Sequence, residues 1–285
     1  MKTPLISIAI PAYNCDRYIA HSIQSVLNQT FEDWELILLN DGSTDHTSEI
    51  MQSYAQRDSR IRVIDENKNC GLIRRLNQSV ALARGKFYAR MDSDDIMHPE
   101  RLKTQISYLL EHPDINVLGS TAYAIDENNK ITAYLDCAEF PNPPRGHGFI
   151  HPSVMAATEW FRRNPYSENY NRIEDYELWL RAFPYSKYYV IQTPLLFYRD
   201  SGTTGPKKYL ATHISALKIA FSSHQYEIGI TTRIRIALGS VLRMLVCISF
   251  SVIGKSQWLL KMRKSRKEIK EITKAQLYLR KAINS

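Results

Sequence analysis

The sequence has 285 residues, 44% of them hydrophobic, and no low-complexity tract. That length suits one α/β domain with its own core plus a smaller appendage, and the composition excludes a largely disordered chain. The net charge of +8 is carried by residues 255–285, which hold ten lysines and arginines against two glutamates. The body before them is neutral, so the charge excludes a basic enzyme and indicates a polyanionic surface as the partner of the tail.

Strand-like and helix-like patterns alternate through the first 110 residues. Short apolar runs predict four strands, at residues 5–11, 34–39, 61–64 and 86–91. Apolar residues at helical spacing predict helices at residues 19–27, 44–55, 72–83 and 99–110. Strands that alternate with helices predict a mainly parallel, doubly wound sheet flanked by helices. Ligands of such sheets bind beyond the carboxyl ends of the strands.

The pattern becomes less regular after this. Residues 119–165 are predicted to be mostly loops, with prolines concentrated at 141–144, and to shape a second binding site. Residues 172–183 then predict a strongly patterned helix. From about residue 205 the chain changes to long helical patterns with basic residues. The sequence therefore predicts a domain of residues 1–205 and a helical, basic region of residues 206–285.

Three carboxylates, those of Asp92, Asp94 and Asp95, follow the fourth predicted strand. Like charges this close repel one another, so a fold that gathers them usually neutralises them with a cation. Hard oxygen ligands suit Mg²⁺ or Mn²⁺, and such an ion can hold a diphosphate and offset the charge of a leaving group. The alternative is a solvated turn that caps the following helix.

Polar residues also follow the first two predicted strands. Asp41 is placed to accept a hydrogen bond from the N–H of a base, or to cap the helix that follows it. Pro11 and Tyr13 are placed to wall a flat base, or to form the edge of a strand.

Two carboxylates, those of Glu174 and Asp175, open the helix predicted at residues 172–183, and Trp179 lies further along it. They fit either of two roles. Acidic residues in a first helical turn complement the helix dipole. A carboxylate there can also be the general base that removes a proton from an acceptor hydroxyl.

Taken in order, these motifs resemble family 2 glycosyltransferases, the large inverting family with the GT-A fold, across roughly residues 5–200. Six segments carry the resemblance: SIAIPAYN at 7–14, SVLNQT at 25–30, NDGSTD at 40–45, ARMDSDD at 89–95, HPS at 151–153 and EDYELWL at 174–180. The resemblance implies a Rossmann-like GT-A fold, with a nucleotide-sugar half to about residue 98 and an acceptor half at residues 99–205.

The resemblance also implies roles for individual residues. Those expected to bind the nucleotide sugar are Pro11, Tyr13, Asp41, Asn69, Asp92 and Ser93. Asp94 is expected to ligate Mn²⁺ or Mg²⁺, and Asp175 to be the catalytic base. Those expected in the acceptor site are Glu174, Trp179 and His151, although a structural role also fits His151.

One segment departs from the family pattern. In many relatives a segment that begins Asn-x-Gly continues to Ala-Arg-Asn, whereas here Asn69-Cys70-Gly71 leads to Leu76 at the position of that arginine. Arg74 or Arg75 is the expected substitute.

The implied reaction is the inverting transfer of one sugar from a nucleotide-sugar donor, with UDP favoured, to a hydroxyl of a saccharide acceptor carried on a lipid. The implied setting is the synthesis of a bacterial surface polysaccharide: O-antigen, lipopolysaccharide or capsule. A processive polysaccharide synthase is the first alternative, but neither several spanning helices nor a Gln-x-x-Arg-Trp motif is found. A nucleotidyltransferase with a similar fold and a nucleic-acid-binding protein that uses the basic tail are the others.

The tail itself predicts contact with a membrane. Residues 234–260 are apolar, but their longest uncharged stretch, 244–254, has eleven residues and is too short to span a bilayer. A basic run at residues 261–270 follows it. This pattern predicts a helix in the interface of an anionic membrane, or else a helical pair packed on the domain.

The cysteines indicate where the enzyme works. Cys15, Cys70, Cys137 and Cys247 are scattered without metal-ligand spacing, which predicts reduced thiols in the cytoplasm. The first residues show no secretory signal. We therefore expect a cytoplasmic protein that is peripheral on the inner face of the cytoplasmic membrane.

Overall fold

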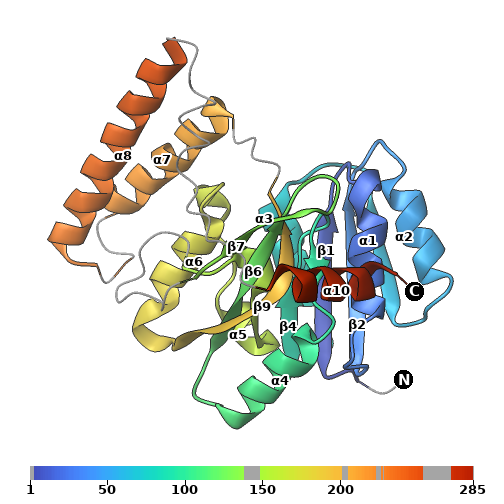
Figure 1. Cartoon of the computed structure of the whole chain (residues 1–285). Helices are drawn as coiled ribbons and strands as arrows, with labels where there is room; N and C mark the ends of the chain where they lie inside the picture. Colours follow the sequence, from blue (N-terminus) through green and yellow to red (C-terminus); the bar gives the residue numbers. More distant parts are fainter. Residues whose placement is uncertain are drawn as a thin grey trace.

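A nine-stranded sheet with helices on both faces forms the centre of the molecule (Figure 1). The computed structural model describes residues 3–137, 148–200, 205–222, 226, 228–252 and 271–284. The prolines at 141–144 and the basic run at 261–270 lie outside the described residues, so the expectations for them stay predictions.

The four predicted strands form the first half of this sheet. They are β1 (Ile6–Ala12), β2 (Trp34–Asp41), β3 (Ile61–Glu66) and β4 (Phe87–Arg90). They pair in parallel in the order β3-β2-β1-β4, connected by α1 (Asp16–Leu27), α2 (Thr47–Ala55) and α3 (Leu72–Leu82). Every residue of β1 and β2 is buried, which explains why apolar residues predominate in both strands.

The second half of the sheet is mixed, which the sequence did not predict. After β5 (Ile96–Met97) and α4 (Arg101–Glu111), the chain forms β6 (Val117–Ile125), β7 (Ile131–Leu135), β8 (Met155–Ala157), α5 (Thr158–Arg163), α6 (Glu174–Ala182) and β9 (Tyr188–Arg199). The whole order is β3-β2-β1-β4-β8-β6-β9-β5, with β7 on β6.

The predicted α/β sheet flanked by helices is confirmed, but its second half differs from two details of the prediction. β6 and β9 are parallel, but β8 is antiparallel to both β4 and β6, and β5 and β7 are antiparallel to their neighbours. A mainly parallel sheet therefore describes only β1–β4. Residues 119–165 are also more regular than predicted, because most of β6 and all of β7, β8 and α5 lie there.

Two apolar cores lie on the two faces of the sheet. Successive strand residues point to opposite faces, so Ile8 packs in one core with Ile19 of α1, and Ala9 packs in the other with Leu76 of α3 and Trp179 of α6. Since helices cover both faces, the carboxyl ends of β1, β2 and β4 are left as the open edge.

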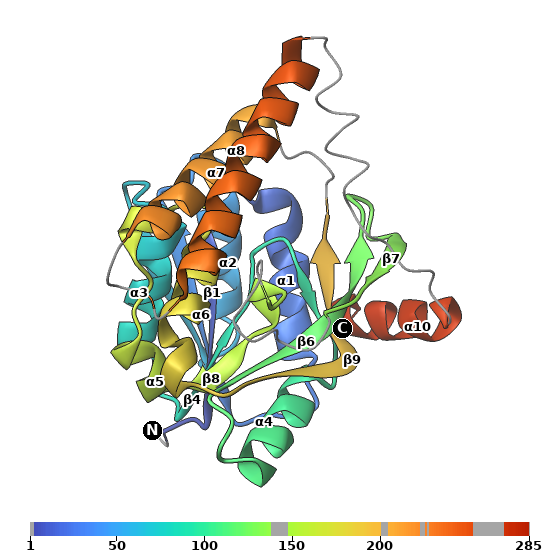
Figure 2. The same cartoon turned by 90° about the vertical axis from the view of Figure 1, so that its left-hand side faces the viewer.

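The last three helices that the structure describes lie in two different places. α7 (Pro206–Phe221) and α8 (Ile230–Val252) lie side by side and project away from the sheet (Figures 1 and 2). α10 (Ile272–Ile283) instead lies on the body of the molecule beside α1. Ala275, Leu279 and Ala282 of α10 are buried in one cluster with Ile96 and Phe197. The described part of residues 206–285 is thus helical, as predicted, but α10 completes the core of the preceding domain. The division near residue 205 stays a prediction.

The described residues include one helix, Ile230–Ser251, that is long and apolar enough to cross a bilayer by length and composition alone, with a mean hydropathy of 1.7. Arg233, Arg235 and Arg243 interrupt it.

His98 follows β5 and is held against α10. Its ring centroid lies 6.1 Å from that of Phe197 and 4.3 Å from that of Tyr278 in α10. Burial lowers the pKa of His98 to about 4. The ionisable groups that line the adjoining cavity with it are Glu100, Tyr123, Glu271, Lys274 and Tyr278.

We predict a pH-dependent stability from His98. Its ordinary pKa is 6.5, so between pH 6.5 and about 4 the unfolded chain binds a proton that the folded protein does not. The free energy of unfolding should be highest above this range and fall by up to about 3 kcal/mol on acidification through it. His98→Asn keeps an acceptor for the Glu100 N–H, which lies 3.2 Å from Nδ1. Urea unfolding across this pH range should show a smaller slope for His98→Asn, and equal slopes would contradict the prediction.

Candidate active site

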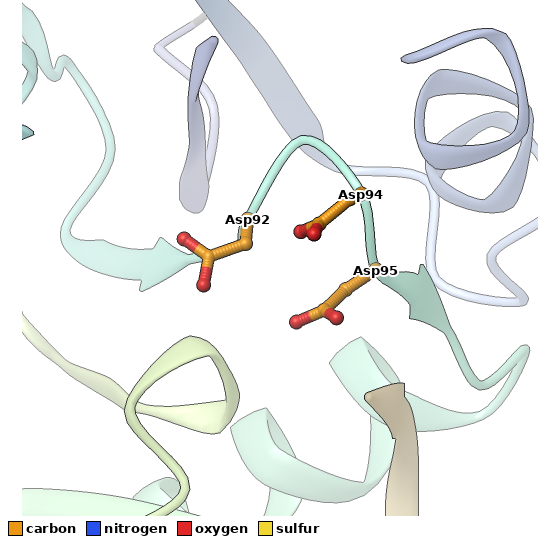
Figure 3. Close-up of side chains that lie close together, drawn as sticks. All are labelled: Asp92, Asp94 and Asp95. Atoms are coloured by element: carbon orange, nitrogen blue, oxygen red, sulfur yellow. The ribbon is translucent and has the colours of Figure 1, made fainter. Parts of the chain in front are cut away.

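The acidic cluster lies on the turn between β4 and β5. The side chains of Asp94 and Asp95 point in the direction of Asp92 (Figure 3). One carboxylate oxygen from each of the three residues lies within 4.8 Å of the other two. Oxygen ligands hold Mg²⁺ and related cations at about 2.0–2.6 Å, so one ion can bridge atoms at such separations.

Charge is unfavourable at this cluster in the absence of a cation. Burial and the neighbouring Asp92 raise the pKa of Asp94 to about 6. Burial and Asp94 raise the pKa of Asp95 well above its usual range, and Oδ2 of Asp95 is buried without a hydrogen-bond partner. These residues therefore fit a divalent cation with oxygen ligands, the type that was predicted. The acidic pattern grouped Asp95 with Asp92 and Asp94 around a cation, whereas the family resemblance assigned the ion to Asp94 alone.

The turn is held rigidly by residues far away in the sequence. From the end of β9, the backbone N–H of Arg199 donates to Oδ1 of Asp95 at 2.7 Å, and its Nε donates to the carbonyl oxygen of Asp94 at 2.7 Å. From α1, Oγ of Ser22 lies 2.7 Å from the carbonyl oxygen of Ser93 and 2.6 Å from that of Asp95. Arg199 and Ser22 were missed from the sequence.

A cavity of about 520 Å³ lies beside the turn. Its lining includes Asp92, Glu174, Asp175 and His151. The structure thus brings a residue predicted for the donor side together with the predicted catalytic base and two residues predicted for the acceptor site. His151 also contacts Tyr166, whose hydroxyl oxygen lies 2.9 Å from Nε2.

The first turn of α6 supplies two carboxylates to the cavity wall. Asp175 is 6% exposed and Glu174 is 8% exposed. Burial and the neighbouring Asp175 raise the pKa of Glu174, and its Oε2 is buried without a hydrogen-bond partner. Just before the helix, Arg172 also lines the cavity and has a left-handed backbone, with φ of 77°. Such strain in a residue other than glycine concentrates at functional sites.

Trp179 is the one acceptor-site residue that the structure places elsewhere. It is fully buried, because its face of α6 packs into the core. Its ring centroid lies 5.2 Å from that of Phe149 and 6.1 Å from that of His151, both of which line the cavity. Trp179 therefore supports the cavity wall from behind and does not line it.

Arg90 is a buried cation among these acids. It is 2% exposed and lines the cavity, and its Nη2 donates to Oδ1 of Asp92 at 2.6 Å. Its charge also acts on Glu174 and Asp95. Arg90 is part of the motif ARMDSDD, but the sequence alone predicted no role for it. The signal available for it was an arginine at the end of a buried strand that is otherwise Phe87, Tyr88 and Ala89.

Asp41 holds the loop that follows β3. Its carboxylate accepts hydrogen bonds from the backbone N–H groups of Cys70 at 2.8 Å and Gly71 at 2.9 Å, and from Nε of Arg75 at 2.6 Å. Arg75 is therefore the arginine that reaches Asp41, whereas Leu76 is fully buried in the core. A carboxylate has further lone pairs, so the predicted contact of Asp41 with a base stays a prediction.

We expect Arg75→Met to lower the free energy of unfolding by about 3–5 kcal/mol, because it leaves the buried Asp41 without its counter-charge. The two side chains are only 5% and 6% exposed. The matched control is Arg74→Met, since Arg74 pairs with Glu168 on the surface, where both side chains are more than half exposed. Urea unfolding should separate the two variants, and similar midpoints would contradict the prediction.

The remaining predicted nucleotide residues lie at the same edge of the sheet. Pro11 is buried in β1, and Tyr13, just beyond it, is 50% exposed. Asn69 is exposed, and its backbone crosses Gly42 so closely that a Cβ there would lie 2.8 Å from N of Asn69. Ser93 is partly buried within the acidic turn.

Comparison with known proteins places this site in context. Residues 7–187 match the model of the family described as "Glycosyl transferase family 2". The O-antigen biosynthesis glycosyltransferase WbnJ of Escherichia coli is 31% identical over 219 residues, which are 73% of this chain and 84% of that protein.

Two solved structures share the fold. S. aureus TarS in complex with UDP-GlcNAc superposes with a TM-score of 0.63 at 20% identity, covering 83% of this chain and 71% of that one. The mannosyltransferase PcManGT from Pyrobaculum calidifontis, in complex with GDP-Man and Mn²⁺, gives a TM-score of 0.58 at 12% identity, covering 99% and 86%.

Proposed function

The chain belongs to glycosyl transferase family 2, whose model matches more than half of its length, and we propose that it moves one sugar from a nucleotide-sugar donor to a hydroxyl of a saccharide acceptor, with inversion at the anomeric carbon. One observation carries this proposal. Asp92, a member of the acidic cluster, and Asp175, at the start of α6, line the same cavity. A diphosphate held near the cluster and an acceptor beside Asp175 would therefore meet there.

Asp175 is the proposed general base. It takes the proton of the acceptor hydroxyl, whose oxygen forms a bond to the anomeric carbon. The bond from that carbon to the diphosphate breaks, and its electron pair leaves with the nucleoside diphosphate. Glu174, whose pKa is raised by burial and by Asp175, lies beside it in the cavity wall, where its carboxyl group can hydrogen-bond a sugar hydroxyl. The guanidinium of Arg90 orients Asp92 beside them.

A Mn²⁺ or Mg²⁺ ion would be held by Asp94, with Asp92 and Asp95 within reach. When bound, such an ion supplies positive charge that stabilises the departing diphosphate. The solved mannosyltransferase of similar fold contains Mn²⁺, which supports this choice. Arg199 and Ser22 keep the turn in place for it.

A UDP-sugar is the proposed donor. The TarS structure of similar fold contains UDP-GlcNAc, and the resemblance at Pro11, Tyr13 and Asp41 favours uridine. The proposed acceptor is a saccharide carried on a lipid at the inner face of the cytoplasmic membrane, in O-antigen, lipopolysaccharide or capsule synthesis. The similarity to an O-antigen biosynthesis glycosyltransferase supports the pathway, and the apolar composition of α8 supports the location.

A donor screen tests the proposal. Release of nucleoside diphosphate is measured from UDP-, GDP- and dTDP-sugars, with Mn²⁺, with Mg²⁺ and with a chelator. Cation-dependent release from one donor is the expected result, and calorimetry should show binding of its nucleotide even without an acceptor. Binding of no nucleotide would overturn the proposal. Release of pyrophosphate from a nucleoside triphosphate would indicate a nucleotidyltransferase, and addition of many sugars per acceptor would indicate a processive synthase.

A further inference from the structure

The outer face of α8 is apolar. Its exposed large aliphatic side chains recur at spacings of three and four residues, which places them along one face of the helix. They are Ile230, Ile234, Leu238, Val241, Leu242, Leu245, Val246 and Ile248. Leu238 is 66% exposed and Leu242 is 63% exposed. We call these eight residues the α8 face.

This distribution is the reverse of that expected for a helix on a soluble protein. The buried side of α8 includes Ser240, 2% exposed, and Cys247, fully buried. Ile236 packs inward against Tyr226 and Ile228, but most of the larger aliphatic residues of α8 point away from the molecule. A continuous apolar surface of this kind marks an interaction site, because burying each such side chain is strongly favourable.

The charges around the α8 face indicate an anionic partner. Arg235 and Arg243 are exposed on the same helix. Between Glu227 and Glu268 the sequence has no acidic residue, but nine basic ones: Arg233, Arg235, Arg243, Lys255, Lys261, Arg263, Lys264, Arg266 and Lys267. An apolar helical face within such a basic segment is complementary to a bilayer that contains anionic lipids.

The docking of α10 argues that α8 lies along the bilayer and does not cross it. α10 packs beside α1 on the sheet domain, which is also where the chain leaves for α8. If α8 crossed the bilayer, the chain would therefore have to cross back between residues 253 and 271. Those 19 residues carry nine charged side chains and cannot pass through hydrocarbon. Arg243 also lies near the middle of α8, where a spanning helix would place it at the bilayer centre.

The segment just before α8 contacts α6, the helix that supplies part of the cavity wall. Just before α8, the hydroxyl of Tyr226 donates to Oε1 of Glu177 at 3.1 Å, and Glu177 is fully buried in α6. The same helix carries Asp175 in its first turn. The position of α8 therefore fixes the orientation of the cavity wall relative to whatever α8 binds.

We propose that α8 lies in the plane of an anionic bilayer, with the α8 face in the acyl boundary and its arginines among the lipid phosphates, and thereby turns the cavity toward an acceptor held in that bilayer. The second part rests on the proposed function, but the docking does not, because lipid binding can be measured without any donor or acceptor.

The test is sedimentation of the full chain with vesicles. Wild type should sediment with vesicles of equal parts phosphatidylglycerol and phosphatidylcholine, and much less with phosphatidylcholine alone. Leu238→Glu combined with Leu245→Glu should weaken partitioning at least about tenfold, since both side chains leave the acyl region. Leu110→Glu is the matched control, because Leu110 is 55% exposed on α4, close to the 57% of Leu245, and should bind as wild type does.

Three outcomes would overturn the proposal. The first is wild-type binding that is equal on both kinds of vesicle. The second is an unchanged affinity of the double variant. The third is no vesicle binding, together with a wild-type dimer that the double variant dissociates, because the α8 face would then be a contact between two copies of the chain. Nucleotide binding by the same samples reports on the proposed function separately and shows that the variants are folded.

Discussion

Replacement of Asp175 by asparagine is expected to lower the turnover number by about 10²- to 10⁴-fold, the usual contribution of a general base. The amide has nearly the same shape but cannot take the proton of the acceptor hydroxyl. Asp175 lines the cavity and is 6% exposed, so bulk water has little access to replace it. Initial rates of nucleoside diphosphate release, with the donor from the screen and a saturating acceptor, measure the effect.

Two further measurements make this result specific. Binding of the nucleotide to Asp175→Asn should match that of wild type, because no nucleotide contact is assigned to Asp175. Glu174→Gln keeps the shape and most of the hydrogen-bonding capacity of a side chain that is not assigned the proton transfer, so it should lose much less turnover. If Glu174→Gln were the more severe variant, the assignment of the base would be wrong.

Replacement of Asp94 by asparagine is expected to have opposite effects on stability and on activity. Burial and Asp92 raise the pKa of Asp94 to about 6, so its charge destabilises the folded protein when no cation is bound. The neutral amide should raise the free energy of unfolding of the metal-free protein by on the order of 2 kcal/mol at neutral pH. Cation-dependent activity should fall by about 10³-fold, because the diphosphate loses its stabilising charge.

Thermal unfolding in the presence of a chelator, and titration with Mn²⁺, measure the two effects on the same sample. Wild type should gain stability on addition of Mn²⁺, and Asp94→Asn should gain little. Asp114→Asn is a suitable control, because Asp114 pairs with Lys187 at the surface, outside the cavity and the acidic turn. A variant that keeps wild-type activity with Mn²⁺ would show that Asp94 does not hold the ion.

The sequence was most informative where structure is local. The strands β1–β4 are short buried runs between helices of clear periodicity, and each was found within a few residues. The strands β6, β8 and β9 pair with partners distant in the chain, and β8 has only three residues. Their pairing depends on tertiary contacts that leave no periodic pattern, so residues 119–165 were predicted to be mostly loops and β9 was not predicted.

The same distinction applies to the site. Asp92, Asp94, Glu174 and Asp175 were visible as acidic residues at the ends of predicted elements. Arg199 was not, because its role depends on the end of β9 meeting the turn after β4, and that contact joins residues more than a hundred positions apart. The misplacement of Trp179 has a related cause: helical spacing does not reveal which face of α6 turns toward the core.

Because α10 packs on the sheet domain, the apolar segments that precede it in the chain cannot be removed by a simple truncation. Nδ2 of Asn28 lies within 3.1 Å of three carbonyl oxygens at the end of α10, and α10 covers Ile96 and Phe197. Truncation of the gene after residue 205 would therefore uncover a core surface next to the acidic turn. Excision of residues 230–270, with residues 271–284 rejoined by a flexible linker, keeps that surface covered and leaves Ile219 and Tyr226 packed on α6. It is the better route to a water-soluble enzyme for crystallisation.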